Sequence, residues 1–194
     1  MTTATPTTAD AFVARLLATD DADKRRALIE HTHLEPTSAR DATQRLLDEA
    51  ERLIGVDPRR MEQVCNDALT LAKQAEDEFL WAMARFKQGE ACTLQDRNAE
   101  ACGYLDEAAD AFTRLSRPVE AARTRILWVW ATAKLGGDAE AVNAARRARR
   151  VFKKYGERLR LATLDMNIGI IHCMRSRYRV GLPYFRSAVA LYQA

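Results

Sequence analysis

Residues 98–112 read NAEACGYLDEAADAF, and the pattern of small and large apolar residues in this stretch recurs along the chain with a period of 40. Ala108 has an alanine at the same place in every copy. A small or apolar residue stands three positions before it, and a small or aromatic residue stands four positions after it. Self-similarity at a fixed period of this length is typical of stacked helical hairpins. The three sets are Ala68, Ala108, Ala148, Ala188; Cys65, Leu105, Ala145, Phe185; and Ala72, Phe112, Phe152, Tyr192.

Apolar periodicity and capping residues predict an all-α chain of four hairpins behind two short helices. Ser38 is expected to cap the first hairpin, Pro58 follows the N-cap Asp57, and glycines close the later helices. We expect residues 1–8 to be disordered, residues 9–37 to form a helical cap, and residues 38–194 to form the repeat domain. The predicted repeats are 38–76, 77–116, 117–156 and 157–194, with helices at 9–18, 20–29, 38–54, 58–75, 77–94, 98–115, 118–135, 138–155, 157–174 and from 178 onward.

The composition is that of a water-soluble helical protein, with 47% hydrophobic and 29% charged residues and only 8 Gly and 5 Pro. No apolar run approaches the roughly 18 to 20 residues of a membrane span, and the Thr-rich start lacks a signal-peptide core, so a cytoplasmic location is expected. We expect no metal or cofactor, because the cysteines lack C-x-x-C spacing and the group His31, His33 and Glu35 lacks further ligands.

Charge is distributed unevenly. Residues 141–194 carry 12 Lys and Arg against only Glu157 and Asp165, whereas residues 1–140 are net acidic. Such polarity predicts a molecule whose two ends meet different neighbours. No phosphate loop or nucleophile motif is present, so we expect a protein that is not an enzyme.

The residues Gln88-Gly89, Ala101, Leu105 and Ala108, and again Ile168-Gly169, Tyr178, Gly181, Phe185 and Ala188, resemble the tetratricopeptide repeat. The resemblance implies a right-handed α-solenoid that binds proteins, with small residues where the two helices of a hairpin cross. The sequence departs from the family where Arg85, Arg125 and Asp165 replace a large apolar residue, where Glu49 and Val129 replace a glycine, and where the period is 40 instead of about 34. Longer repeats of this kind are similar to those of bacterial multidomain regulators such as tetratricopeptide proteins with a caspase-like CHAT domain, and residues 12–30 look like the segment that precedes the repeats of the latter.

In the family the first helix of each repeat lines a concave groove. Carried over to this chain, the resemblance implies an apolar groove that binds a peptide or an amphipathic helix. The alternative is that these side chains pack against one another and leave only a narrow slot. The lysine and asparagine that bind a carboxylate in chaperone-binding relatives are missing, and Trp128 is interpreted as core. The expected groove contacts are Phe86, Ile126, Trp130, Met166, Ile170 and Met174.

The helix predicted at 138–155 has an apolar face that includes Ala148, Phe152 and Tyr155, and a basic face opposite to it. That basic face is a solvated surface, a site for an acidic protein, or a site for nucleic acid through its phosphates. Interleaved aromatic residues for base stacking are missing, which disfavours nucleic acid. The basic patch consists of Arg146, Arg149, Arg150, Lys153 and Lys154.

The last predicted helix carries Val189, Leu191 and Tyr192 without a polar capping helix behind it. Two interpretations follow from this: more chain follows in the natural protein, or this end of the array associates with a second copy. The sequence thus gives two expected roles, a protein-binding scaffold and a self-associating module.

Overall fold

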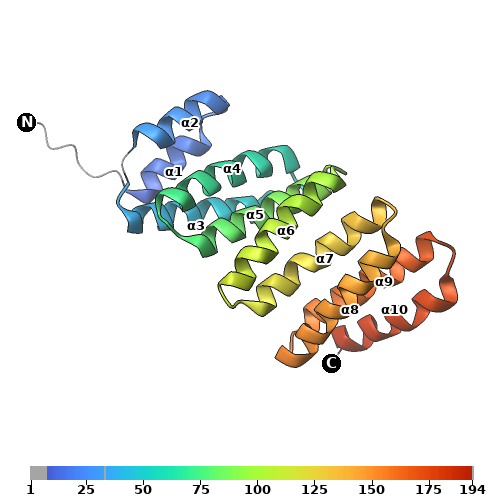
Figure 1. Ribbon diagram of the computed structural model, residues 1–194. Coiled ribbons are helices and arrows are strands. Elements are labelled where there is room, and N and C mark those ends of the chain that lie inside the picture. Colours follow the sequence, from blue (N-terminus) through green and yellow to red (C-terminus); the bar gives the residue numbers. More distant parts are fainter. Residues whose placement is uncertain (1–7, 33, 194) are drawn as a thin grey trace, which may run out of the picture. The chain divides into compact units, whose positions relative to one another are not determined.

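The computed structural model describes residues 8–32 and 34–193, and all of its regular secondary structure is α-helical (Figure 1). The expected all-α class is confirmed. The helices are α1 (Ala9–Leu17), α2 (Ala22–His31), α3 (Pro36–Arg52), α4 (Pro58–Gln74), α5 (Glu78–Leu94), α6 (Asn98–Arg114), α7 (Pro118–Lys134), α8 (Asp138–Tyr155), α9 (Arg158–Met174) and α10 (Tyr178–Gln193).

The chain divides into two compact units, residues 1–95 and residues 96–194. The division falls inside the predicted repeat 77–116, so that α5 belongs to the first unit and α6 to the second. We call these unit 1 and unit 2 and describe each by itself.

Most predicted helix bounds lie within two residues of the observed ones, and the start of α3 shows what decides such a boundary. This helix begins at Pro36 and not after Ser38, because the fixed φ and missing N–H of proline suit the first helical position. The predicted helical cap begins with α1, and Thr8 is the N-cap residue of this helix. The Thr8 side chain accepts a hydrogen bond from the Ala11 N–H at 3.3 Å. The other residues expected to be disordered, 1–7, lie outside the described part of the chain.

The helices from α4 to α10 begin at positions 58, 78, 98, 118, 138, 158 and 178, within one residue of the predicted starts, so helix starts recur at half the period of the sequence repeat. A backbone with positive φ closes each of the six turns between them, at Glu76, Asp96, Ser116, Gly136, Gly156 and Ser176. In five turns the next N–H returns to the carbonyl five positions earlier at 2.8 to 3.0 Å, which is the Schellman arrangement. The module of the array is therefore one helix and its turn, and two such modules make one copy of the longer repeat.

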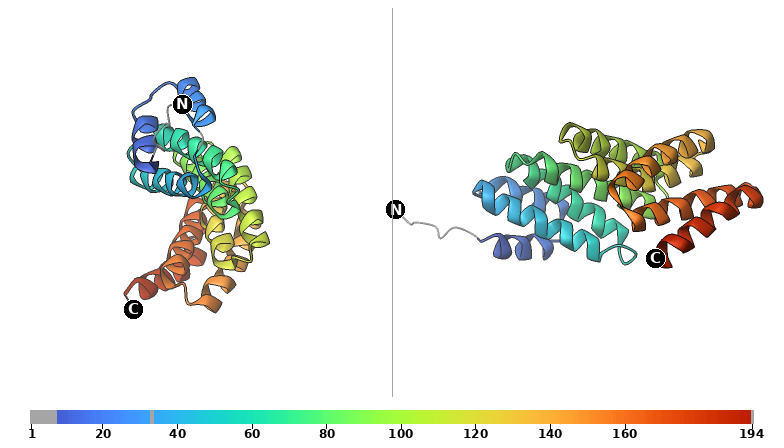
Figure 2. Two further views of the ribbon diagram at one scale, coloured as in Figure 1. Left: turned by 90° about the vertical axis from the view of Figure 1, so that its left-hand side faces the viewer. Right: turned by 90° about the horizontal axis from the view of Figure 1, so that it is seen from below.

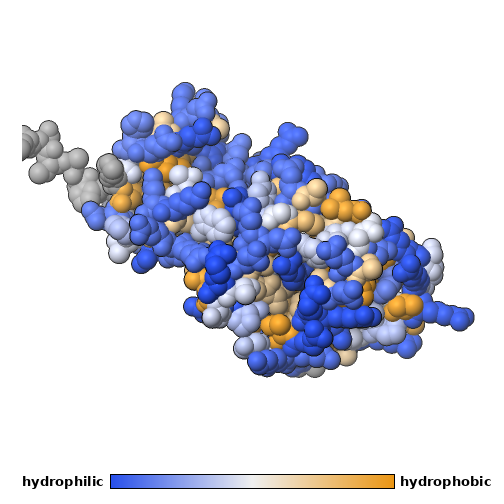
Figure 3. Space-filling view, in the orientation of Figure 1, coloured by the Kyte–Doolittle hydropathy of each residue, from blue (hydrophilic) through white to orange (hydrophobic). Residues whose placement is uncertain are grey.

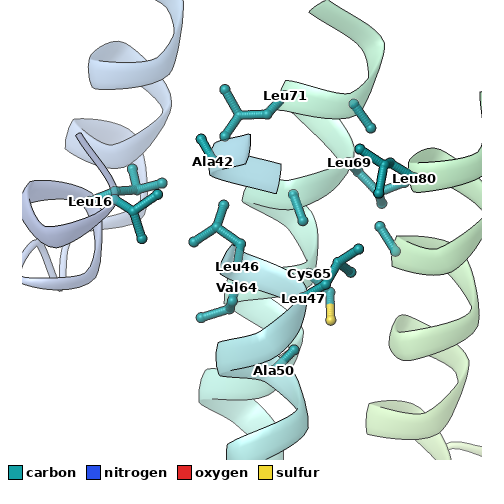
Figure 4. Close-up of a cluster of buried hydrophobic side chains, with 14 of the residues drawn as sticks. Leu16, Ala42, Leu46, Leu47, Ala50, Val64, Cys65, Leu69, Leu71 and Leu80 are labelled. Carbon is teal, nitrogen blue, oxygen red and sulfur yellow. The ribbon is translucent and has the colours of Figure 1, made fainter. Parts of the chain in front are cut away.

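Unit 1 is built on the pair α3 and α4, with α5 packed against both, α1 on α3, and α2 on α4. Figure 4 shows Leu16 of α1 pointing toward Ala42 and Leu46 of α3, while Leu69 of α4 meets Leu80 of α5. An ion pair adds to this core, since the buried Arg25 of α2 donates to Asp67 of α4 through Nε at 2.9 Å and Nη2 at 2.5 Å. Desolvation raises the pKa of Asp67 although Arg25 opposes the shift.

In unit 2, each helix from α6 to α10 packs against the next (Figures 1 and 2). The tightest crossing joins α9 and α10. A Cβ added to Gly181 would lie 2.9 Å from the carbonyl oxygen of Gly169, and one added to Gly169 would lie 2.8 Å from the Phe185 ring. The expectation that small residues let the two helices of a hairpin approach closely is confirmed at this crossing.

Candidate functional site

The candidate site lies where α9 packs directly against α7, although α8 separates these two helices in the sequence. In the described part of unit 2, α6 makes little contact with α8, and α8 makes little contact with α10. The odd-numbered helices thus approach more closely than the even-numbered ones. Two polar ties fix α9 on α7: Asn167 Nδ2 donates to the Ile126 carbonyl and Arg175 Nη2 to the Ala133 carbonyl, both at 3.2 Å.

Apolar side chains from both helices occupy the surface between these ties, and we call it the α7–α9 surface. Met166 and Met174 of α9 are 37% and 46% exposed, whereas the others are partly buried. Lys134 Nζ lies 5.4 Å from the centroid of the Trp130 ring, which places a cation on the edge of the patch. Its members are Ile126, Trp130, Met166, Ile170 and Met174.

Phe86, the sixth expected contact, lies on α5 in unit 1 and is only 4% exposed. Its ring therefore offers little surface to a partner. The lysine beside it is also buried and pairs with Glu51 of α3 and, at 2.7 Å, with Glu90. The structure groups the five unit 2 residues and leaves Phe86 out of the α7–α9 surface.

Trp128 is buried, as expected of a core residue, and its indole N–H donates to Asp106 Oδ2 of α6 at 3.1 Å. The equivalent positions one repeat earlier, in unit 1, are Gln88 and Asn66, and Gln88 donates a hydrogen bond to Asn66. A polar tie between a helix and the next one is thus repeated in the two units. It stayed hidden in the sequence because the donor changes from an amide to an indole.

The basic patch on α8 proves to be divided. Arg146, Arg150, Lys153 and Lys154 are exposed, whereas Arg149 is partly buried and pairs with Asp165 of α9 through two hydrogen bonds of 2.5 and 2.8 Å. Tyr155, expected on the apolar face of α8, is not buried. It is the last residue of α8 and 48% exposed, and its ring lies 5.4 Å from Lys154 Nζ instead of in the core.

Asp165 is the residue whose role the sequence left open. Its carboxylate is fully buried and accepts, besides Arg149, the hydroxyl of Ser187 in α10 at 2.7 Å. One carboxylate therefore joins α8, α9 and α10 at the position where the tetratricopeptide pattern has a large apolar side chain. The sequence signal for this junction of three helices is an aspartate at a repeat position where the tetratricopeptide pattern has an apolar residue.

A second apolar surface lies on α10, which buries only Gly181 and Ala188. Five large side chains of this helix are between 47% and 63% exposed. The face shown in Figure 3 carries hydrophobic surface as separate patches among hydrophilic residues. Tyr178, Leu182, Val189 and Tyr192 share one side of α10 by helical periodicity, whereas the exposed Val180 lies on the opposite side.

No three side chains of His, Cys, Asp or Glu come together as a metal site within residues 8–32 and 34–193. Of the ligand group considered above, His33 lies outside the described residues, while His31 is exposed. Cys65 is buried, and burial raises the pKa of its thiol far above the ordinary value. Among the described helices, none is both long enough and apolar enough to span a bilayer.

Comparison of the chain with protein-family models and with curated proteins gives no match.

Proposed function

We propose that this chain is a right-handed, tetratricopeptide-like scaffold that binds an apolar protein segment, helical or extended, on the α7–α9 surface. The observation that carries the proposal is the grouping of Trp130 with two exposed methionines along two helices held in fixed register. Methionine adapts its shape to different partners, and tryptophan supplies a large contact area. The role is binding and not catalysis.

Binding on this surface follows the physics of a helix in a groove. A segment with apolar residues at helical spacing would cover Ile126 and Met166 at one end and Met174 at the other, with its polar face toward solvent. Burying about 500 Å² of apolar surface contributes on the order of 12 kcal/mol before association costs. Lys134, beside Trp130, favours a partner with an acidic residue at that place.

The proposal is tested by selecting binders from a displayed peptide library on the whole protein. We expect enrichment of sequences with Leu, Ile or Phe at spacings of three and four residues, and loss of their binding to a variant with Trp130→Ala and Met166→Ala. Tyr155→Ala is the matched control, because it removes a half-exposed aromatic ring from α8 in the same unit. A library that yields no binders, or binders that the double variant retains, would contradict the proposal.

Self-association is a second candidate function, favoured by the apolar surface of α10. If two copies pair there, sedimentation velocity should show a concentration-dependent dimer that Val189→Glu abolishes. A monomer at every concentration eliminates this candidate and leaves the peptide-binding proposal intact.

A further inference from the structure

A cavity of about 360 Å³ lies between α8 and α9, on residues that the α7–α9 surface does not use. Its walls combine an apolar part from both helices with a strongly basic part. The lining residues are Asp138, Ala139, Val142, Asn143 and Arg146 of α8, Ile171 and His172 of α9, and Arg177 of the turn that follows α9.

The positive charge of this cavity is not neutralised by the protein. Asp138 is the one acidic residue among the described residues that line it, and both of its carboxylate oxygens already accept hydrogen bonds from Arg175, at 2.9 and 3.2 Å. Those bonds lower the pKa of Asp138. Arg146 and Arg177 are exposed and form no ion pair with any residue in the described ranges. Within residues 8–32 and 34–193, no carboxylate forms an ion pair with either guanidinium group, although the charges of Asp138 and Arg177 attract each other at longer range.

His172 adds a buried polar side chain to the same wall. It is 9% exposed, its ring stacks on Tyr184 with centroids 5.8 Å apart, and its nitrogens hydrogen-bond to no residue of the described chain. Burial, and then the charge of Arg177, lower the pKa of this imidazole, so the ring is neutral near pH 7 and carries one N–H donor. The ring nitrogens are not among the buried unpaired polar atoms of the described residues, so they are open to the cavity and available to a ligand.

We propose that this cavity binds the phosphoryl group of a phosphomonoester, held by Arg146, Arg177 and His172. Two uncompensated positive charges match a dianion better than a singly charged carboxylate, and guanidinium groups bind phosphate oxygens in paired hydrogen bonds. The volume exceeds that of a phosphate ion, and Val142 and Ile171 offer apolar contact to the organic part of an ester. This inference does not rest on the peptide-binding proposal.

Binding is measured on the whole protein by calorimetry in a buffer free of phosphate and sulfate, with phenyl phosphate as the probe. We expect saturable binding, weakened about tenfold or more by Arg146→Gln and by Arg177→Gln, since each removes a hydrogen bond to a charged group. The matched control is Arg150→Gln, which removes the same charge from α8 outside the cavity and should change affinity less than about twofold. Failure to bind at millimolar concentrations, or equal weakening by the control, overturns the proposal.

A second readout reports on the site directly. The chain contains 3 histidines, so the ring signals of His172 can be followed by NMR. Bound phenyl phosphate should raise the pKa of His172, because a nearby anion favours the imidazolium form. The groups that face this ring are Asp138, Arg177 and Tyr184. An unchanged pKa at saturation would place the anion elsewhere and refute the assignment.

Four ligands distinguish the source of the phosphoryl group. Tighter binding of phenyl phosphate than of inorganic phosphate supports an ester that uses the apolar wall. Tighter binding of a phosphoserine peptide than of free phosphoserine identifies a phosphorylated protein segment as the ester, and the reverse identifies a small molecule. Equal affinity for all, inorganic phosphate included, contradicts an ester site.

Discussion

Asp165 shows how one residue can hold three helices together. A fully buried carboxylate is costly to desolvate, and here three donors from Arg149 and Ser187 compensate that cost. The arginine keeps about a quarter of its side-chain surface in solvent, which weakens the attraction relative to a fully buried pair. The pair specifies one placement of α8 and α10 on α9.

Replacing Asp165 with alanine should lower the free energy of unfolding by about 3 kcal/mol, because Arg149 would be left half-buried without its partner. Urea denaturation followed by circular dichroism measures the change. Arg150→Ala, on the exposed side of the same helix, should stay within about 0.5 kcal/mol of the parent. A loss below about 1 kcal/mol for Asp165→Ala would show that the carboxylate does not hold this junction.

Two glycines of unit 2 should respond in opposite ways to the same substitution. Gly181→Ala places a methyl group 2.9 Å from a backbone oxygen of α9, so we expect a loss of about 1 to 3 kcal/mol. Gly103, in the interior of α6, has no atom within 4 Å of such a methyl group, and Gly103→Ala should stabilise by up to about 1 kcal/mol. Thermal unfolding of both variants tests the pair, and shifts of the same sign would contradict the close crossing of α9 and α10.

At the scale of helices, the turns carry more information than the helix interiors. Each turn needs one residue in the left-handed region, which glycine adopts without steric cost. Only Gly136 and Gly156 meet that preference, and the other four turns use Glu76, Asp96, Ser116 and Ser176. Glycine at the positive-φ position of these four turns should therefore raise the free energy of unfolding.

Ser116→Gly should raise the free energy of unfolding and Gly156→Ala should lower it, each by about 1 kcal/mol, because only the residue's cost at positive φ changes. The midpoints of thermal unfolding measure both. Thr113→Gly, in the last turn of the same α6, is the control for added flexibility and should be destabilising. No gain from Ser116→Gly together with no loss from Gly156→Ala would mean that these turns tolerate either residue.

The same turns explain how far prediction from sequence could go. Helix bounds followed from proline, aspartate and apolar spacing, which act locally. The residue that takes the positive φ could not be predicted at four of the six turns, because these positions lack glycine and a single Glu76 or Ser116 carries no visible turn signal. The start of α3 was misplaced because Ser38 and Pro36 both favour a helix start and proline prevailed.

Over the whole chain, the structure brings together some of the residues of each predicted surface and separates others. Five of the six groove residues lie together on α7 and α9, because the repeat register places them on equivalent helices. Arg149 of the basic patch pairs with Asp165 of α9. This could not be predicted, because an ion pair between two helices depends on how they cross and not on either helix alone. The cavity around His172 could not be predicted, because it needs α8, α9 and the following turn in place.

Stability should fall toward the helices with one packing partner in each unit. In unit 2, α10 packs on α9, whereas α7 contacts α6, α8 and α9. In unit 1, α2 is held on α4 mainly by Ile29 and the Arg25–Asp67 pair. Amide hydrogen exchange should therefore be fastest in α2 and α10 and slowest in α4 and α7, and uniform protection would contradict nearest-neighbour packing.

The constant spacing of helix starts has a consequence for how such a gene can change. Equivalent residues recur at every second turn. Recombination of the gene between two such turns would therefore join one turn to another and leave each helix whole. An array that gains or loses one such copy would keep the same packing between neighbouring helices. A surface such as that of Trp130 and Met166 can diverge in one copy while its neighbours keep the array folded.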